Sequence, residues 1–138
     1  FLLSEFLAAN RPGALSTQFR GRVMLHGHCH HKAVAKLDEE EALLRASGAD
    51  VETLDSGCCG MAGSFGFEAE HYDLSMQVGE LALLPAVRRT SADTLIVADG
   101  VSCREQIRQA TGRRAVHLAE ALRAGLARSS DFRVQISD

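Results

Sequence analysis

Four short β-prone runs recur along the chain, separated by longer segments with a helical pattern. Residues 22–26 (RVMLH) and 51–54 (VETL) each have the length and β-branched character of a strand. Residues 94–98 (TLIVA) form an unbroken apolar run, typical of a strand buried on both faces. Residues 115–117 give a short fourth strand. A polar loop is expected over residues 27–31, after the first strand.

Helical patterns fill most of the remaining chain. Asp38 and Glu41 form a plausible capping box for a helix that Gly48 can end, and Ser102 is a candidate cap for a helix over residues 103–111. The other helices are expected over residues 1–9, from 72 onward with a break near 79–85, and over 118–128. Between residues 56 and 67 a glycine stands at almost every third position, which favours a tight folded loop.

This order of strands and helices predicts an α/β fold: a small parallel sheet of about four strands with flanking helices, in a Rossmann-like three-layer arrangement. Residues 1–128 are expected to form one cysteine-rich domain, followed by a poorly ordered tail over 129–138. The loops that carry chemistry in such sheets follow the carboxyl ends of the strands. All four cysteines follow predicted strands, so we expect them at one edge of the sheet. They are Cys29, Cys58, Cys59 and Cys103.

Composition narrows the class of protein. The 138 residues are 46% hydrophobic and 24% charged, the balance of a compact domain. A net charge of -3 without a long basic run argues against nucleic acid as a partner. No apolar stretch approaches the ~20 residues of a membrane span, and no signal-peptide pattern opens the chain, so a cytoplasmic location is expected, with peripheral membrane association left open. The start at Phe1 suggests a piece of a longer protein.

The cysteines are best explained by a metal site. Four cysteines are too few for a disulfide-dense secreted scaffold, and a disulfide between the adjacent Cys58 and Cys59 would be strained. Iron prefers thiolate ligands, and adjacent cysteines suit a polynuclear cluster because its irons offer separate coordination points. Glycines at 57, 60 and 63 (Gly57, Gly60, Gly63) let the backbone wrap closely and aim N–H groups at sulfur.

Two other interpretations of the cysteines stay open on the residues alone. They could be buried thiols that pack as small apolar groups. They could also bind zinc, with His28, His30 or His117 completing a tetrahedron. Of the histidines around the first cysteine, His28 and His30 are the preferred ligands or donors to sulfur. His26 is expected to be a core histidine, and His31 an exposed residue at a helix start.

The cysteine pattern resembles the cysteine-rich CCG domain of iron–sulfur oxidoreductases, which occurs in one subunit of heterodisulfide reductase and in glycolate oxidase iron–sulfur subunits. A closer likeness is to the carboxyl-terminal part of large FAD-linked 2-hydroxyacid dehydrogenases. It covers roughly residues 23–126. The segments that carry it are HGHCH at 26–30, GCCGMAG at 57–63 and SC at 102–103.

The resemblance implies a non-catalytic electron-transfer domain that holds a four-iron, four-sulfur cluster. Its partner would be a flavin-binding domain or subunit whose FAD oxidises a 2-hydroxyacid such as D-lactate, glycolate or D-2-hydroxyglutarate. The family also places a histidine at the position of His117. The family pattern ends in Cys-x-x-Cys, whereas Gly100 precedes Cys103 here, so one of five thiolates is missing and four remain for an ordinary cluster. The competing class is a zinc-binding or metal-free structural or subunit-interaction module.

Overall fold

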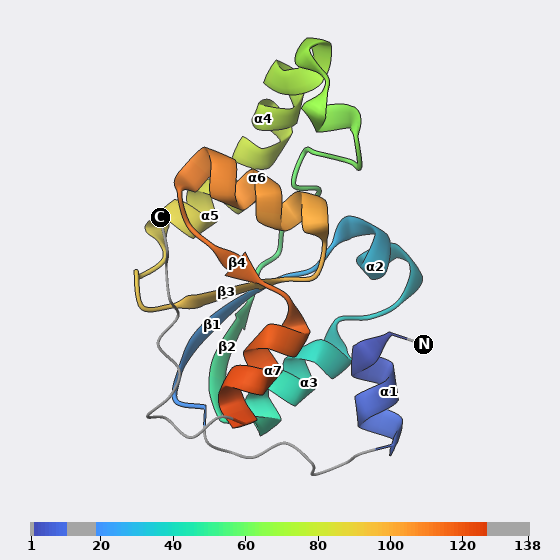
Figure 1. Cartoon of the computed structure of the whole chain (residues 1–138), viewed down its shortest axis with the longest axis vertical. Helices are drawn as coiled ribbons and strands as arrows, with labels where there is room; N and C mark the ends of the chain where they lie inside the picture. Colours follow the sequence, from blue (N-terminus) through green and yellow to red (C-terminus); the bar gives the residue numbers. More distant parts are fainter. Residues whose placement is uncertain (1, 11–18, 127–138) are drawn as a thin grey trace.

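The computed structural model describes residues 2–10 and 19–126 (Figure 1). The tail predicted over residues 129–138 lies outside the described residues, as do residues 127–128 of the last predicted helix.

A parallel four-stranded sheet forms the centre of the molecule. Its strands are β1 (Gly21–His26), β2 (Ala49–Thr53), β3 (Leu95–Ala98) and β4 (Ala115–Val116). Their order across the sheet is β2-β1-β3-β4, and every neighbouring pair runs parallel. The predicted fold class is therefore confirmed, with all four strands within a few residues of their expected positions.

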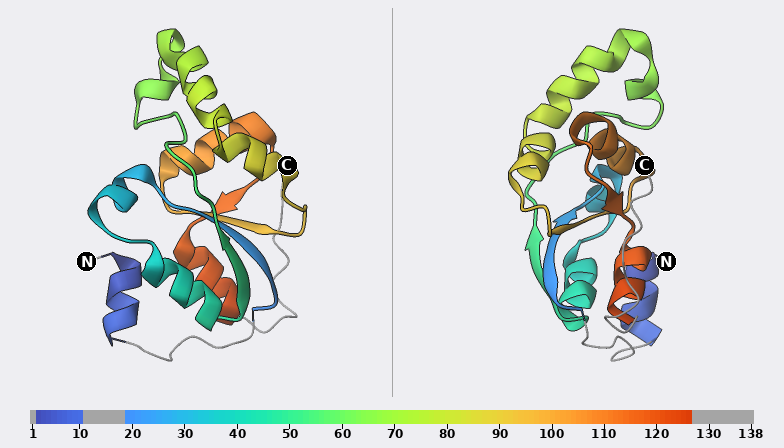
Figure 2. Two further views of the ribbon diagram at one scale, coloured as in Figure 1. Left: turned by 180° about the vertical axis from the view of Figure 1, so that it is seen from behind. Right: turned by 60° about the vertical axis from the view of Figure 1, so that its left-hand side comes forward.

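Helices cover both faces of the sheet and complete three layers (Figures 1 and 2). One face carries α3 (Asp38–Ala46) and α7 (Leu118–Leu126), with α1 (Leu3–Asn10) packed beside α3. The other face carries α5 (Leu83–Arg89) and α6 (Val101–Thr111). The remaining elements are α2 (Cys29–Val34), α4 (Tyr72–Glu80) and the single-turn 3-10 helices η1 (Phe65–Phe67) and η2 (Ala69–His71).

Alternate residues of the strands feed two separate hydrophobic cores, as expected for a sheet covered on both faces. Val23, Leu25 and Val97 pack under α3 and α7, whereas Met24 and Ile96 pack under α5 and α6. The second of these cores also contains Cys59 and Cys103, which are 3% and 1% exposed. Two of the candidate ligands are thus held in place by the packing of the fold itself.

Three helix starts differ from the sequence-based expectation. The predicted capping box of Asp38 and Glu41 does not form, since Leu37 caps α3 without a side-chain hydrogen bond and the Glu41 carboxylate accepts from Thr53 and Arg45. The loop predicted over residues 27–31 is already helical at Cys29, because the Lys32 N–H bonds to the His28 carbonyl and closes the first turn of α2. In α6 the cap is Gly100 rather than Ser102, since the Arg104 N–H bonds to the Gly100 carbonyl. The earlier start of α2 brings Cys29 into the first turn of a helix, and the earlier start of α6 makes Cys103 its third residue instead of its first.

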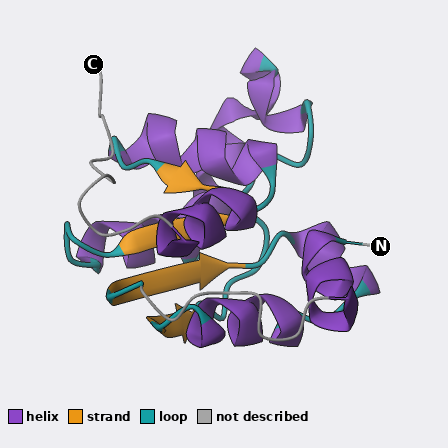
Figure 3. Ribbon diagram, turned by 60° about the horizontal axis from the view of Figure 1, so that its bottom comes forward, coloured by secondary structure: helices purple, strands orange, loops and turns teal. Residues whose placement is uncertain are grey.

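The strand order creates a switch point between β1 and β3. The chain leaves β1 toward β2 on one side of the sheet, and it leaves β3 toward β4 on the other side. The loops after β1 and β3 therefore diverge and open a crevice beyond the carboxyl ends of these strands, where open α/β sheets bind their ligands. Figure 3 shows the layers from another side.

Candidate metal centre

The four cysteines converge on this crevice from three separate loops. Cys29 is the exposed first residue of α2, and Cys103 is buried in the first turn of α6. Half-buried Cys58 and buried Cys59 lie in the glycine-rich loop after β2. The Sγ atoms of Cys29 and Cys58 are 4.0 Å apart, and the thiols of Cys59 and Cys103 share a hydrogen bond. Cys59 also contacts the neighbouring Cys58 thiol, so the four thiols form one continuous group.

Backbone N–H groups of the glycine-rich loop point at sulfur. The Gly60 N–H donates to Cys58 Sγ at 3.4 Å, and the N–H groups of Met61 and Ala62 donate to the sulfur of Cys59. Hydrogen bonding from Cys103 is the largest cause that lowers the pKa of Cys59, and these backbone donors add to it. The hydrogen bond between Cys103 and Cys59, together with burial, raises the pKa of Cys103. The loop is thus preorganised to stabilise negative charge on sulfur.

Close backbone packing explains why part of this loop needs glycine. Gly60 has a positive φ of 97°, and a Cβ there would lie 2.0 Å from the Ser75 carbonyl oxygen of α4. On the facing helix, a Cβ at Gly79 would lie 2.9 Å from the Cys59 carbonyl oxygen. Helix α4 and the cysteine loop therefore meet backbone to backbone, and side chains at these two glycines would separate them.

A second set of contacts fixes the start of the loop against β1 and α2. Buried Ser56 hydrogen-bonds His26 Nδ1 through its Oγ at 2.8 Å and accepts the Lys32 ammonium at its carbonyl oxygen. Burial is the main reason that the pKa of His26 falls to about 4, so this histidine is neutral at physiological pH. The prediction of His26 as a core histidine is confirmed. Because Ser56 precedes Cys58 by two residues, these contacts bring Cys58 toward Cys29.

Of the predicted histidine ligands, one lies beside the thiols and two line a neighbouring cavity. His28 lies beside Cys103, where its ring borders the space of an absent side chain at Gly100. His30 and His117 line a cavity of about 610 Å³ next to the thiols, which His28 and Gly100 also border. The predicted Gly57 and Gly63 have nothing within 4 Å of a built Cβ, so neither supports the close packing seen at Gly60.

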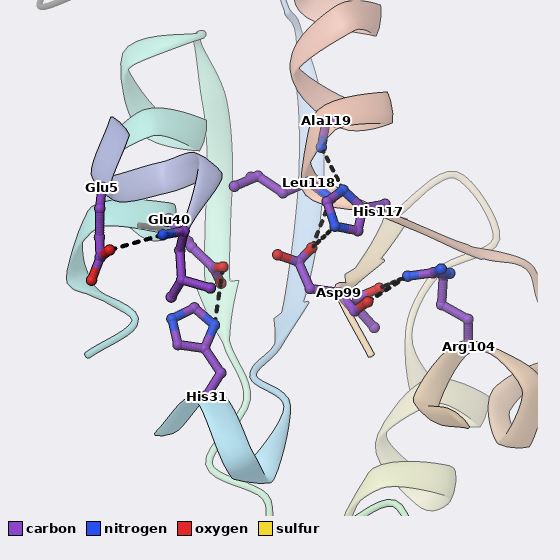
Figure 4. Close-up of polar contacts among 10 residues, drawn as sticks. Glu5, His31, Glu40, Asp99, Arg104, His117, Leu118 and Ala119 are labelled. Atoms are coloured by element: carbon purple, nitrogen blue, oxygen red, sulfur yellow. Dashed lines mark hydrogen bonds and ion pairs between the residues drawn. The ribbon is translucent and has the colours of Figure 1, made fainter. Parts of the chain in front are cut away.

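A buried polar network, missed from the sequence, adjoins the same cavity (Figure 4). His31 Nδ1 lies 3.2 Å from Glu40 Oε1, and donor atoms of His31, Glu40 and Asp99 all lie within 4.8 Å of one another. Asp99 Oδ1 accepts the Leu118 N–H at 2.8 Å and lies 3.7 Å from His117 Nε2. Burial, followed by the charge of Asp99, raises the pKa of Glu40 to about 8. The expectation that His31 is exposed is wrong, since it is 7% exposed beneath this network.

One residue of this network could have been identified from the sequence, because it directly follows a predicted strand. Asp99 directly follows β3, the same signal that drew attention to the cysteines. Nothing comparable marks Glu40, which stands among four consecutive acidic residues at the start of α3, where carboxylates usually complement the helix dipole.

Comparison with curated proteins finds relatives among dehydrogenases. The chain is 36% identical over 106 residues to a subunit of anaerobic glycerol-3-phosphate dehydrogenase from Escherichia coli (strain K12), covering 73% of this chain and 26% of the relative. It is 36% identical over 81 residues to D-2-hydroxyglutarate dehydrogenase from the same strain, covering 59% of this chain and 8% of that relative. Against the Pseudomonas putida D-2-hydroxyglutarate dehydrogenase it is 30% identical over 104 residues, covering 74% of this chain and 10% of the relative.

These matches relate the chain to oxidoreductases, as the cysteine pattern predicted, and specifically to a subunit or segment of larger dehydrogenases. The chain spans about a quarter of the glycerol-3-phosphate dehydrogenase subunit and a tenth or less of the D-2-hydroxyglutarate dehydrogenases. No family model and no solved structure matches the chain. Within residues 2–10 and 19–126, none of the helices has the length and apolar character needed to cross a membrane.

Proposed function

We propose that this chain is an iron–sulfur electron-transfer domain of a flavin-dependent dehydrogenase that acts on a 2-hydroxyacid such as D-lactate, glycolate or D-2-hydroxyglutarate. Cys29, Cys58, Cys59 and Cys103 would hold the cluster. The observation that carries the proposal is the meeting of these thiols, drawn from three loops, at the switch point of a parallel sheet. A bound cluster would supply reversible one-electron redox chemistry.

The adjacent Cys58 and Cys59 favour a polynuclear cluster over a single zinc ion. A polynuclear cluster spreads its coordination points over several irons, so neighbouring cysteines can bind different irons.

The polar surroundings of the thiols also suit an anionic cluster. N–H groups of Gly60, Met61 and Ala62 point at Cys58 or Cys59 sulfur, as expected where hydrogen bonds stabilise thiolates and tune potential. Cys29 is exposed, and the apolar side chains of Val34 and Val101, which line the adjacent cavity, are 69% and 74% exposed. This edge of the sheet therefore offers a redox partner a short path to the site and an apolar surface for contact.

The relatives support the assignment of catalysis to another part of the enzyme. The chain matches less than a third of each dehydrogenase compared above. We therefore assign the flavin, the substrate and the 2-hydroxyacid chemistry to a partner domain or subunit, and electron acceptance to this chain. A cytoplasmic location and a single domain over residues 1–128 stay predictions from the sequence.

A redox titration tests this function. After anaerobic reconstitution with iron and sulfide, stepwise addition of dithionite is expected to bleach the visible absorption by about one electron equivalent per chain and to restore it on reoxidation. Flavin reduced in a relative's catalytic domain should cause the same bleaching. Bound iron that accepts no electron at any potential would contradict an electron-transfer role and favour a structural one.

A further inference from the structure

His28 and the side-chain position of residue 100 occupy the same space. A Cβ built on Gly100 would lie 2.4 Å from His28 Cδ2 and 3.1 Å from its Cγ. The same Cβ would lie 2.9 Å from Cys103 Sγ. Any side chain at position 100 would therefore enter the thiol site, and the imidazole ring already fills that position. The backbone at Gly100, with φ -66° and ψ 126°, would itself accept any residue.

The ring atoms of His28 nearest to this space are the carbons Cδ2 and Cγ. Nε2 is bonded directly to Cδ2, so one of the two ring nitrogens lies one bond beyond this contact. His28 is half-buried at the start of α2, next to Cys29, so one short segment presents both the imidazole and a thiol to the site. The neutral imidazole nitrogen is a common ligand for iron.

Other histidines near the site have different partners or positions. His26 is buried against Ser56, and His31 faces Glu40. His117 accepts the Ala119 N–H at Nδ1 and lies near Asp99 through Nε2. His30 is exposed on α2, with its ring 6.4 Å from that of His28. Only His28, among these described histidines, contacts the space next to a cysteine sulfur.

We propose that His28 is a nitrogen ligand of the metal centre and takes the coordination position that a side chain at residue 100 would otherwise supply. The proposal rests on the iron–sulfur function above and gives the cluster five protein ligands, four thiolates and one imidazole, in place of the four thiolates of an ordinary cluster. Exchange of a thiolate for a neutral imidazole removes one negative charge from the site, which raises its reduction potential, as histidine ligation does in iron–sulfur proteins.

Pulsed EPR on the reduced, reconstituted protein tests the proposal. Protein labelled with nitrogen-15 at histidine is expected to show a strong coupling from a directly bound nitrogen, which His28→Ala abolishes and the matched variant His30→Ala preserves. His28→Cys should retain iron and sulfide, lose the coupling and shift the midpoint potential downward. A coupling that survives in His28→Ala, or a wild-type protein with full iron and sulfide but no such coupling, would overturn the assignment.

A double variant distinguishes the loss of a ligand in His28→Ala from simple misfolding. Removal of the ring frees the space beside Gly100, so Gly100→Cys in the His28→Ala background should recover the iron affinity that His28→Ala loses, at least about tenfold. If the double variant has native circular dichroism but does not recover iron affinity, His28 and a side chain at residue 100 do not supply the same coordination position. Absence of iron and sulfide from every variant and from wild type would instead overturn the iron–sulfur function, and this inference with it.

Discussion

Replacement of Glu40 with glutamine tests whether this buried carboxyl group keeps its proton at neutral pH. Glu40 is 2% exposed, faces Asp99 and has His31 Nδ1 at 3.2 Å from Oε1. Burial and the neighbouring carboxylate move its pKa from 4.5 to about 8. Below pH 4.5 both the native and the unfolded state hold the proton, so the contribution of the neutral group to stability is complete there.

Stability is then lost as pH rises toward 8. Between the two pKa values the unfolded chain releases a proton that the native state retains, which lowers the free energy of unfolding by at most about 1.4 kcal/mol per pH unit. From pH 5 to pH 8 this amounts to a ceiling of about 4 kcal/mol, and relaxation around the charged group makes about 2 kcal/mol the working expectation. Glu40→Gln keeps the shape of the side chain but cannot ionise, so its stability should lack this decline.

Urea unfolding followed by circular dichroism, in reducing metal-free buffer at several values of pH, measures the effect. Wild type should lose about 2 kcal/mol or more relative to Glu40→Gln between pH 5 and pH 8. Exposed Glu52, on β2, provides the control, and Glu52→Gln should follow the wild-type profile. Parallel profiles for wild type and Glu40→Gln would refute the reasoning, since they would mean that Glu40 is ionised and neutralised by His31.

Two further predictions concern the contacts that support the cysteine loop. Gly60→Ala places a Cβ 2.0 Å from the Ser75 carbonyl oxygen at a positive φ, so it should cost about 3 kcal/mol or more in urea unfolding, whereas Gly57→Ala, in open space, should change stability by less than about 1 kcal/mol. Equal effects of the two would contradict the backbone contact. Gln106→Ala removes the amide that donates to the Ser75 carbonyl at 3.3 Å and Oγ at 3.2 Å, at a cost of about 1–3 kcal/mol, while exposed Gln109→Ala should be near neutral.

The fold and the gathering of the cysteines were predictable because both depend on strand order. Apolar runs of strand length set the positions of β1 and β3, and parallel pairing brings their carboxyl ends to the same edge. Residues that directly follow the strands therefore meet, whatever their separation along the chain. The break between α4 and α5 was also predictable, since the chain leaves the helix just after Gly79 and re-enters it with Pro85 in the first turn.

Contacts that depend on side-chain packing were not predictable. The burial of His31 requires a helix that starts at Cys29 and turns the ring toward Glu40, and the local sequence favours a loop there equally well. The roles of the three loop glycines also look identical in sequence, although only Gly60 meets the backbone of α4. Likewise, the family resemblance marks Gly100 only as the place of a missing thiolate, whereas in the structure the His28 ring lies against it.

The content of iron, acid-labile sulfide and zinc after anaerobic purification tests the central claim most directly. Wild-type protein should hold iron and sulfide in equal amounts, with zinc well below one per chain. Cys59→Ala should lose both iron and sulfide, while Ser64→Ala, an exposed change in the same loop, should retain them. Stoichiometric zinc without sulfide, or full iron retention in Cys59→Ala, would contradict an iron–sulfur centre held by these four cysteines.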